Sequence, residues 1–569
     1  MEYLLLFGAV MIGLIFKGFY DGKQAKKKLR NRLIESWGKN PTKEYTEEKY
    51  RSLGYYYEKH AFCQEKGRFF IDGITWNDLA LDELFLTMNH TCSAMGEEVL
   101  YALLHEPMLK TKELLAREQL IRFFENPEKK EERLQFQMLL SEIGKHSKIS
   151  VFEYMSRITS AKRQSNGVHY AALAGYGLGI LLLPFSMPAG GILLLLLVIY
   201  NVIGYYKRKG EIEPFLAAMS YTIRLLKAAE RISDLQIPEL SDYLKPIRET
   251  VKSFHGFCRG ASAVASQNAT GDMMSLFLDY FRILFHSDLM KFNRMLREFL
   301  ERRQELTTVF ETIGFLDSMC AAASFRTYYG EYCIPELKEQ TKAELCVTGM
   351  YHPFVEHPVK ADITTTGSVL LTGSNASGKS TFLKEVAVNA LLAQTIHTAL
   401  CTSYRGSCFR ILTSIALTDN LFDGESYYIV EIKSLKRILD AMSLEYPTLC
   451  FVDEVLRGTN TVERIAASSR VLLSLAEQNA ICFAATHDIE LTHLLENVYR
   501  NYHFEEQISD GRVVFDYKLK EGRATSQNAI WLLAMLGYPG ELIASAKKTA
   551  EHFTETGEWK LFDRKEEET

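Results

Sequence analysis

A glycine-rich stretch followed by a lysine and two hydroxyl residues is the part of this sequence best suited to chemistry. It follows the apolar run Val369–Leu371 and precedes a helical pattern. The spacing G-x-x-x-x-G-K-[ST] between a strand and a helix predicts a loop whose backbone N–H groups surround phosphates. In such a loop Lys379 binds the β and γ oxygens, and the Ser380 hydroxyl binds Mg²⁺. The predicted phosphate-binding residues are Gly373, Ser374, Asn375, Ala376, Ser377, Gly378, Lys379, Ser380 and Thr381.

An acidic pair, Asp453 and Glu454, ends a second apolar run at Leu449–Val452. Many strands end in acidic residues, but a position downstream of a phosphate-binding loop makes this pair specific. We expect Asp453 to hold Mg²⁺ together with Ser380. We expect Glu454 to orient or deprotonate an attacking water. The pair therefore predicts hydrolysis of a nucleoside triphosphate.

A histidine follows a third apolar run, Ala480–Ala485, in the string Thr486-His487-Asp488. A strand ending at the same sheet edge would bring His487 to the same phosphates, where the ring can donate to the γ-phosphate or to the water. A surface histidine without a role is the alternative. Because His487 follows the third of three such apolar runs, we favour a catalytic role for it, together with Lys379 and Glu454.

The elements around these motifs predict two kinds of fold. From residue 345 onward, short apolar runs alternate with helical patterns, which is typical of an α/β nucleotide-binding domain. Residues 72–163 and 207–344 have helical periodicity, including one long amphipathic helix over Ser287–Phe310. Residues 21–71 are polar and tyrosine-rich and are expected to form a connecting segment.

Composition sets limits on the whole chain. Its 569 residues predict three to four folded units, and 47% hydrophobic with 24% charged residues argues against disorder. A net charge of -5 does not favour a general polyanion binder, although a local basic face is still compatible with it. The ten cysteines include no C-x-x-C pair, which argues against a zinc site or a disulfide framework. A mean hydropathy near zero excludes a polytopic transporter.

The first apolar stretch, Tyr3–Tyr20, predicts a membrane anchor. A cleaved signal peptide is the alternative, but it would carry its basic residues first. Here the basic cluster Lys23–Arg32 follows the apolar stretch, which suits an uncleaved helix with its N-terminus outside.

The second apolar stretch is longer and contains no Asp, Glu, Lys or Arg from 164 to 206. Prolines between its two runs predict a helical hairpin that crosses a membrane twice, at 169–186 and 189–206. Basic residues flank both ends, which predicts a multi-pass cell-membrane protein with both flanks and the ATPase domain in the cytoplasm. A buried hairpin inside a soluble domain is the alternative.

At this point the sequence resembles a known family. The glycine-rich loop, the string D-E-x-x-R-G-T-x-T from Asp453 to Thr461, and Ala485–His487 together resemble the ATPase domain of the MutS family of DNA mismatch repair proteins. Transporter ATPases share the loop and the acidic pair but lack that string. The segment Asp419–Tyr428 with Glu431 resembles the signature segment of the family.

The resemblance implies an ABC-type P-loop ATPase domain, preceded by an all-α core and lever domain. It implies ATP and Mg²⁺ as ligands, and a homodimer with ATP sandwiched between subunits. Ser426 would then contact the γ-phosphate bound by the partner, which adds it to the catalytic residues. The sequence departs from the family at Glu425, where mismatch repair members have a basic residue, and at Tyr427-Tyr428.

The likeness continues outside the ATPase, at Leu84–Pro107 and Phe315–Glu336 of the helical core and at Gly522–Pro539 near the end. About fifty residues separate the first apolar stretch from the core, too few for the family's mismatch-reading and connector domains. The expected ligand of the core is DNA or a branched DNA structure. The alternatives are a protein or membrane partner without DNA, and a membrane scaffold with residual nucleotide binding.

These predictions divide the chain into seven parts. They are an anchor (1–20), a connecting segment (21–71), the first part of a helical core (72–163), a transmembrane hairpin (164–206), the rest of the core with lever helices (207–344), the ATPase domain (345–550) and a charged tail (551–569).

Overall fold

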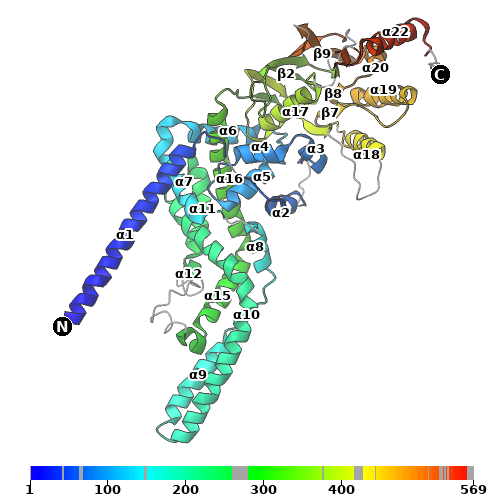
Figure 1. Ribbon diagram of the computed structural model, residues 1–569. Helices are drawn as coiled ribbons and strands as arrows, with labels where there is room; N and C mark the ends of the chain where they lie inside the picture. The colour runs from blue at the N-terminus through cyan, green and yellow to red at the C-terminus, as the bar shows by residue number, and fades with distance from the viewer. Residues whose placement is uncertain are drawn as a thin grey trace, which may run out of the picture. The chain divides into compact units, whose positions relative to one another are not determined.

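The computed structural model contains two compact units, each built from several stretches of chain (Figure 1). A helical unit comprises residues 1–70, 82–106 and 112–330, and an α/β unit comprises 71–81, 107–111 and 331–569. The structure describes residues 2–41, 44–62, 68–145, 150–258, 280–374, 377–415, 427–442, 444–509, 512–524, 530, 533–534 and 537–559.

The described part of the helical unit contains only helices, as the sequence predicts. Its α-helices are α1 (Glu2–Ser36), α2 (Glu47–Phe62), α4 (Leu81–Met88), α5 (Ala94–Leu104), α6 (Thr111–Glu125), α7 (Lys130–Ile143), α8 (Val151–Ile158), α9 (Gly167–Leu182), α10 (Met187–Ser233), α11 (Ser241–Ser253), α12 (His255–Cys258), α15 (Ser287–Glu301) and α16 (Arg303–Tyr329). Short 3₁₀ turns, η1 (Pro127–Lys129) and η2 (Pro238–Leu240), precede α7 and α11.

Helices α5 and α16 form the centre of this unit, and small residues let them approach closely. A Cβ on Gly314 of α16 would lie 3.0 Å from the Met95 carbonyl oxygen of α5. The buried Asp317 carboxylate accepts hydrogen bonds from the backbone N–H groups of Cys92 and Ser93 and from the Ser93 hydroxyl. The start of α5 is therefore fixed to α16 by charge-assisted hydrogen bonds.

Two helices occupy much of the predicted connecting segment 21–71: α1 continues to Ser36, and α2 buries Leu53 and Tyr56 in the core. One prediction about the helical unit is wrong. The predicted long helix over Ser287–Phe310 is broken at Arg302, which has φ −119° and separates α15 from α16.

Helices α9 and α10 form the predicted hairpin, with a turn at 183–186 that overlaps the predicted turn between Pro184 and Gly191. Glycines bring the helices together, since a Cβ on Gly190 would lie 3.0 Å from the Gly179 carbonyl oxygen. The predicted second span ends at Tyr206, but helix α10 continues beyond this residue to Ser233. It is a single helix of 47 residues whose second half enters the core of the helical unit.

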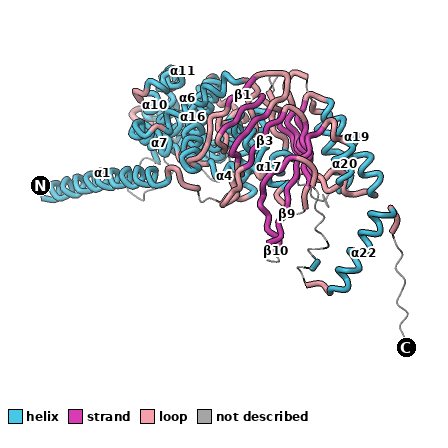
Figure 2. Tube along the Cα trace, turned by 90° about the horizontal axis from the view of Figure 1, so that it is seen from above, coloured by secondary structure: helices cyan, strands magenta, loops and turns pink. Residues whose placement is uncertain are grey.

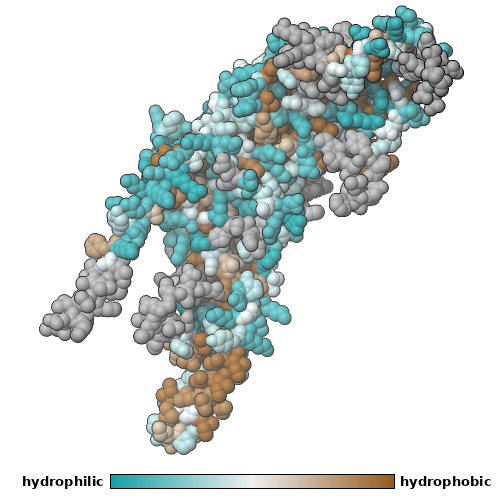
Figure 3. Space-filling view, viewed as in Figure 1, coloured by the Kyte–Doolittle hydropathy of each residue, from teal (hydrophilic) through white to brown (hydrophobic). Residues whose placement is uncertain are grey.

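The side chains of this hairpin are largely exposed (Figure 3). Among the described helices, α10 alone is long and apolar enough to cross a membrane, and 11% of its apolar window is buried. The 16-residue α9 is shorter. For most of the predicted first span, within α1, the structure describes the helix but not the side chains. Exposed apolar side chains of the hairpin include Leu178, Ile180, Leu181, Phe185, Met187, Ile192, Leu195, Leu196, Ile199 and Ile203.

The α/β unit is built around a six-stranded sheet with the order β10-β9-β4-β8-β7-β6. Figure 2 shows the strands of this unit in magenta. Neighbouring strands are parallel except for the β9–β10 hairpin at the edge. Strands β4, β7 and β8 have apolar centres and are buried over almost their whole length, which is typical of strands covered on both faces. The strands are β4 (Ser368–Thr372), β6 (Arg410–Ser414), β7 (Thr448–Asp453), β8 (Ala480–Ala485), β9 (Tyr499–Ser509) and β10 (Arg512–Glu521).

A second sheet and several helices complete this unit. The four-stranded sheet has the order β1-β5-β2-β3, and α17 packs against β2 as well as β6, β7 and β8. The short α3 joins from far upstream, because the Asp78 carboxylate accepts from the Thr413 hydroxyl at 2.6 Å. The remaining elements are β1 (Glu336–Lys338), β2 (Leu345–Met350), β3 (Ala361–Thr365), β5 (Ser403–Ser407), α3 (Gly73–Asp78), α17 (Lys379–Thr395), α18 (Tyr427–Asp440), α19 (Thr461–Glu477), α20 (Ile489–Leu494) and α22 (Gly540–Thr556).

Candidate nucleotide-binding site

Three neighbouring parallel strands end at one edge of the six-stranded sheet. In their register Ala485 of β8 pairs with Leu371 of β4 on one side and Asp453 of β7 on the other. The residues that follow these strands must therefore meet at the same edge. They are the glycine-rich loop, the acidic pair and the histidine that the sequence singled out.

The glycine-rich loop needs its glycines for both conformation and space. Gly373 has φ 148°, and a Cβ there would lie 2.8 Å from the Ser377 hydroxyl oxygen. Gly378 has φ 108°, and its Cβ would lie 3.2 Å from the ring of Tyr517. A side chain at either position would be crowded and its backbone strained, so both positions favour glycine.

Lys379, the first residue of α17, extends its side chain back into the loop. Its ammonium donates to the carbonyl oxygens of Gly373 and Ser374, both at 2.8 Å. Burial lowers the pKa of Lys379, while the carboxylates of Asp453 and Glu454 act in the opposite direction. A buried, oriented cation in a loop of backbone groups is suited to binding phosphate oxygens.

Ser380 and Asp453 form the pair expected to hold a metal ion. The Ser380 hydroxyl donates to Oδ2 of Asp453 at 2.5 Å. The other oxygen, Oδ1, is buried and has no hydrogen-bond partner among the described residues. Burial raises the pKa of Asp453. A buried carboxylate oxygen without a donor beside a hydroxyl is suited to Mg²⁺, which prefers oxygen ligands and completes its octahedron with water and phosphate.

No group of three or more His, Cys, Asp or Glu side chains among the described residues could hold a metal by itself.

Glu454 and His487 face each other across the strand ends. His487 Nε2 lies 3.1 Å from Oε1 of Glu454 and 3.3 Å from the ammonium of Lys379. Glu454 is also ion-paired with Arg457. Burial tends to raise the pKa of Glu454, but the hydrogen bond with His487 and the charge of Arg457 outweigh it, so the pKa is lowered. Glu454 is therefore a carboxylate at neutral pH, able to accept a proton or a hydrogen bond from water.

The backbone at Glu454 is held in an unusual conformation. Glu454 has φ 51° and Leu456 has φ 61°, in the left-handed region that non-glycine residues seldom occupy. The Glu454 N–H donates to the Ala485 carbonyl at 2.9 Å. The Glu431 carboxylate accepts from the N–H groups of Leu456 and Arg457. These hydrogen bonds compensate the strain and direct the Glu454 side chain to the sheet edge.

The structure thus brings together Lys379, Ser380, Asp453, Glu454 and His487. Thr381 lies one residue further along α17. Asn375, Ala376 and Ser426 lie outside the described residues, as does all of 416–426.

Sequence reasoning gave no site role to three residues that support this arrangement. Arg457 pairs with Glu454, Glu431 holds the following backbone, and Tyr517 covers Gly378. A signal existed for Glu431, because it shares the buried face of α18 with Leu435 and Ile438, and a carboxylate on an apolar face needs a partner. No local pattern marks Tyr517, which reaches the loop from the edge strand β10.

A phosphate-binding loop at the carboxyl edge of a mostly parallel sheet, with an acidic pair on the next strand but one, defines a P-loop nucleotide-binding protein. Residues 369–554 match the family described as MutS domain V. This segment of the chain belongs to the MutS family and is divergent within it. Members of this family are ATPases.

Several DNA mismatch repair proteins named MutS are similar to this chain. The protein of Roseiflexus castenholzii is 32% identical over 250 residues, which cover 41% of this chain and 22% of that protein. The protein of Thermus aquaticus is 32% identical over 257 residues, covering 44% and 31%. That of Natronomonas pharaonis is 28% identical over 267 residues, covering 45% and 30%. The chain thus matches less than a third of the length of these relatives.

Proposed function

We propose that this protein is a membrane-anchored, Mg²⁺-dependent ATPase of the MutS family. The observation that carries the proposal is the convergence of Lys379, Ser380, Asp453, Glu454 and His487 at one sheet edge. Bound Mg²⁺ would neutralise charge on the β and γ phosphates. Ser380 and Asp453 would hold it.

The other residues of the site have separate roles in ATP binding and hydrolysis. The loop N–H groups and Lys379 bind the phosphates and stabilise the charge of the transition state. Glu454 orients the attacking water and accepts its proton. His487, hydrogen-bonded to Glu454, keeps this carboxylate in place and can donate to the γ-phosphate.

The test is ATP turnover by the purified full-length protein with and without Mg²⁺. We expect Glu454→Gln to keep ATP affinity and lower turnover by about 100-fold or more, because the amide cannot accept a proton. Glu490→Gln, an exposed glutamate of α20, is the matched control and should keep turnover. Lys379→Ala should instead weaken ATP binding. Turnover at the wild-type rate in Glu454→Gln would remove this residue from the role of base.

We further propose that ATP closes a homodimer, with Ser426 of each subunit completing the site of the other. Membership of the MutS family supports this arrangement. Closure on ATP and opening after hydrolysis would drive the helical unit between two states.

DNA or a branched DNA structure is the proposed ligand of the helical unit, and the name of the relatives, DNA mismatch repair protein, supports it. Residues 21–62 contribute α1 and α2 to the helical unit itself. This supports the view that residues 21–71 form no mismatch-reading domain.

A membrane or protein partner without DNA is the second candidate, favoured by the exposed apolar hairpin. A DNA titration at two salt concentrations separates the two. Phosphate contacts to DNA give an affinity that falls steeply with salt, whereas a protein lacking DNA contacts shows no saturable binding at either concentration.

The proposal that the α9–α10 hairpin inserts into a membrane rests on the exposure of its apolar side chains. A buried core hairpin would place its apolar side chains inside the protein, but the apolar window of α10 is 11% buried. Phe185 and Met187 at the turn are 87% and 78% exposed. An apolar surface of this kind is suited to lipid or to another protein. We propose the cell membrane as its location, with the ATPase on the cytoplasmic side.

A further inference from the structure

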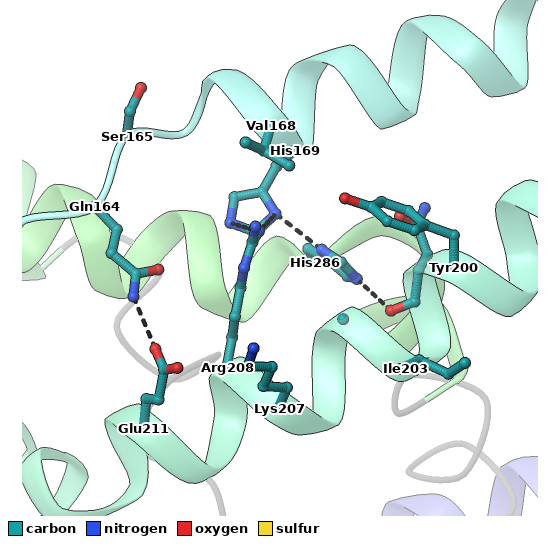
Figure 4. A pocket seen from close by; sticks show the side chains of 12 residues that line it. Gln164, Ser165, Val168, His169, Tyr200, Ile203, Lys207, Arg208, Glu211 and His286 are labelled. Atoms are coloured by element: carbon teal, nitrogen blue, oxygen red, sulfur yellow. Dashed lines mark hydrogen bonds between the residues drawn. The ribbon is translucent and has the colours of Figure 1, made fainter.

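A pocket of about 590 Å³ lies where the hairpin joins the helical unit (Figure 4). Its walls come from the start of α9, the middle of α10 and the residue before α15. On α10 it extends from Tyr200 to Glu211, the stretch where the apolar run gives way to charged residues. In an inserted hairpin this is the depth of the lipid head groups.

Two buried histidines form a hydrogen-bonded chain in the wall of this pocket. His286 Nε2 lies 3.0 Å from the Asn201 carbonyl oxygen, which can only accept, so this nitrogen carries the hydrogen. Nδ1 of His286 is then the acceptor for Nδ1–H of His169, at 2.8 Å. Nη1 of Arg208 lies 3.3 Å from both ring nitrogens of His169, so the guanidinium packs over the face of this ring. Both rings are neutral in this arrangement, and the His169 ring positions the guanidinium at the wall of the pocket.

The pocket has an excess of positive charge. Lys207 and Arg208 line it, and among the described residues no carboxylate lies within 4 Å of either cation. The single acidic group in the lining, Glu211, accepts a hydrogen bond from Gln164 at 2.9 Å. A neighbouring pocket of about 260 Å³ shares Gln164 and Ser165 and adds Arg163 and Arg297. An oriented arginine without a carboxylate partner is suited to binding a phosphate.

The rim of the pocket is apolar. Val168, Tyr200 and Ile203 line it and are 45%, 61% and 65% exposed. Polar and cationic groups inside and apolar groups at the rim match a ligand with a phosphate at one end and hydrocarbon at the other. An inorganic phosphate or a free nucleotide would make no use of this rim.

We propose that this pocket binds the phosphate of a membrane phospholipid, with Arg208 and Lys207 as its ligands. The inference rests on the proposed membrane insertion of the hairpin. A bound head group would fix the depth of α10, which continues without a break into the helical unit.

The test uses full-length protein in a neutral detergent, titrated with dihexanoyl phosphatidylglycerol and monitored by native mass spectrometry. We expect saturable binding that weakens about tenfold or more in Arg208→Gln, the loss expected for a charge-assisted hydrogen bond. Lys209→Gln is the matched control. It removes the same charge from the next residue of the helix, outside the pocket lining, and should leave the affinity unchanged.

Two further arms identify the ligand. Dihexanoyl glycerol, which lacks the phosphate, should not bind at the same concentrations. Inorganic phosphate should compete weakly. Equal binding of dihexanoyl glycerol would overturn the phosphate assignment, and inorganic phosphate binding as tightly as the lipid would overturn the lipid. Glu211→Gln should strengthen binding, because it removes a negative charge from the pocket.

Arg208→Gln could also disturb the histidine chain, so Arg208→Lys is made in parallel. It keeps the charge but loses the planar fork, and we expect intermediate affinity. Each variant must retain wild-type Mg²⁺-ATP turnover and circular dichroism. If Arg208→Gln and Lys209→Gln weaken lipid binding equally, the loss comes from the overall charge of the protein and not from the pocket, which would contradict the proposal. Release of the protein from membranes by carbonate would instead contradict insertion, so the two failures are distinct.

Discussion

Asp453 and Glu454 are adjacent carboxyl groups whose pKa values move in opposite directions. Burial raises the pKa of Asp453, whereas His487 and Arg457 lower that of Glu454 against the effect of burial. The two directions fit two roles. Asp453, which keeps one buried oxygen without a donor, gains most from a cation, and Glu454, which is held by His487 and Arg457, stays ionised.

Glu385, on the helix that follows the phosphate-binding loop, is a second buried carboxyl group. One of its oxygens has no hydrogen-bond partner, and burial raises its pKa to about 8. The folded protein therefore retains a proton that the unfolded chain releases near pH 4.3. The stabilising effect of this proton is fully present below pH 4.3 and is lost as the pH rises to about 8.

We predict that Glu385→Gln removes this pH dependence. Each pH unit in the window is worth about 1.4 kcal/mol for one group, so the slope is measurable. The measurement is the midpoint of thermal unfolding of the purified protein from pH 5 to pH 8. Midpoints of the wild type should fall with pH relative to those of Glu385→Gln. Glu477→Gln, an exposed glutamate of α19, should retain the wild-type slope. Parallel curves for wild type and Glu385→Gln would show that Glu385 is ionised in the folded protein.

At the scale of elements, the α9–α10 hairpin depends on close approach of the two helices. A Cβ on Gly190 would lie 3.0 Å from the Gly179 carbonyl oxygen and 3.0 Å from the Leu183 nitrogen, both backbone atoms that cannot move aside. A Cβ on the next residue, Gly191, would meet nothing within 4 Å.

We predict that Gly190→Val separates the helices and that Gly191→Val does not. The two variants add the same side chain at neighbouring positions, so hydrophobicity and helix propensity are matched. The measurement is disulfide cross-linking in a protein without native cysteines, between cysteines placed at Gly175 and Leu197, which face each other across the hairpin. Cross-linking should fall in Gly190→Val only. An equal fall in both variants would mean that valine acts on the helix rather than on the contact.

The strands and the candidate site could be predicted because their signals are local. Val369–Leu371, Leu449–Val452 and Ala480–Ala485 are apolar runs, and each lies in an observed strand that ends at or within two residues of a predicted site residue. The membership of α3 in the α/β unit could not be predicted, because it depends on long-range hydrogen bonds of Thr75 and Asp78 with Thr413 and Ile415. The break between α15 and α16 at Arg302 could not be predicted either, because the apolar periodicity of the sequence continues through it.

At the scale of the whole molecule, the proposed dimer makes a prediction about mixed subunits. Chains carrying Ser426→Arg are mixed with chains carrying Lys379→Ala. A mixed dimer then has one intact site and one doubly damaged site. If the subunits pair at random in a symmetric dimer, activity should recover to about a quarter of the wild-type rate. Each variant alone should be inactive. No recovery in a sample with demonstrated mixed dimers would contradict a shared site.

Helix α10 links the proposed membrane segment directly to the helical unit. Its first half is exposed, whereas from Ile212 onward it contributes Leu216, Met219 and Leu225 to the core. A helix of 47 residues without a break transmits a displacement along its axis, so a hairpin fixed in lipid would restrict how this helical unit can move. The depth and direction of the hairpin therefore matter for the whole protein.

The last prediction concerns this direction. Basic residues on both flanks predict that both ends of the hairpin are cytoplasmic and that its turn reaches the outside. Ser186 in the turn and Ser165 before α9 are both exposed, so single cysteines at these positions, in a protein without native cysteines, can report on each side. On intact cells an impermeant thiol reagent should label Ser186→Cys and leave Ser165→Cys unlabelled until the membrane is opened.

Carbonate extraction separates the possible outcomes of that experiment. Protein that stays in the membrane with Ser186→Cys labelled from outside has a hairpin that crosses twice. Protein that stays in the membrane with Ser186→Cys protected has a hairpin that enters without crossing, which the 16 residues of α9 would allow and which would contradict the multi-pass topology. Protein released by carbonate would contradict insertion itself, and the exposed side chains of α10 would then have to be covered by another protein, because an apolar surface of this kind is not stable in water.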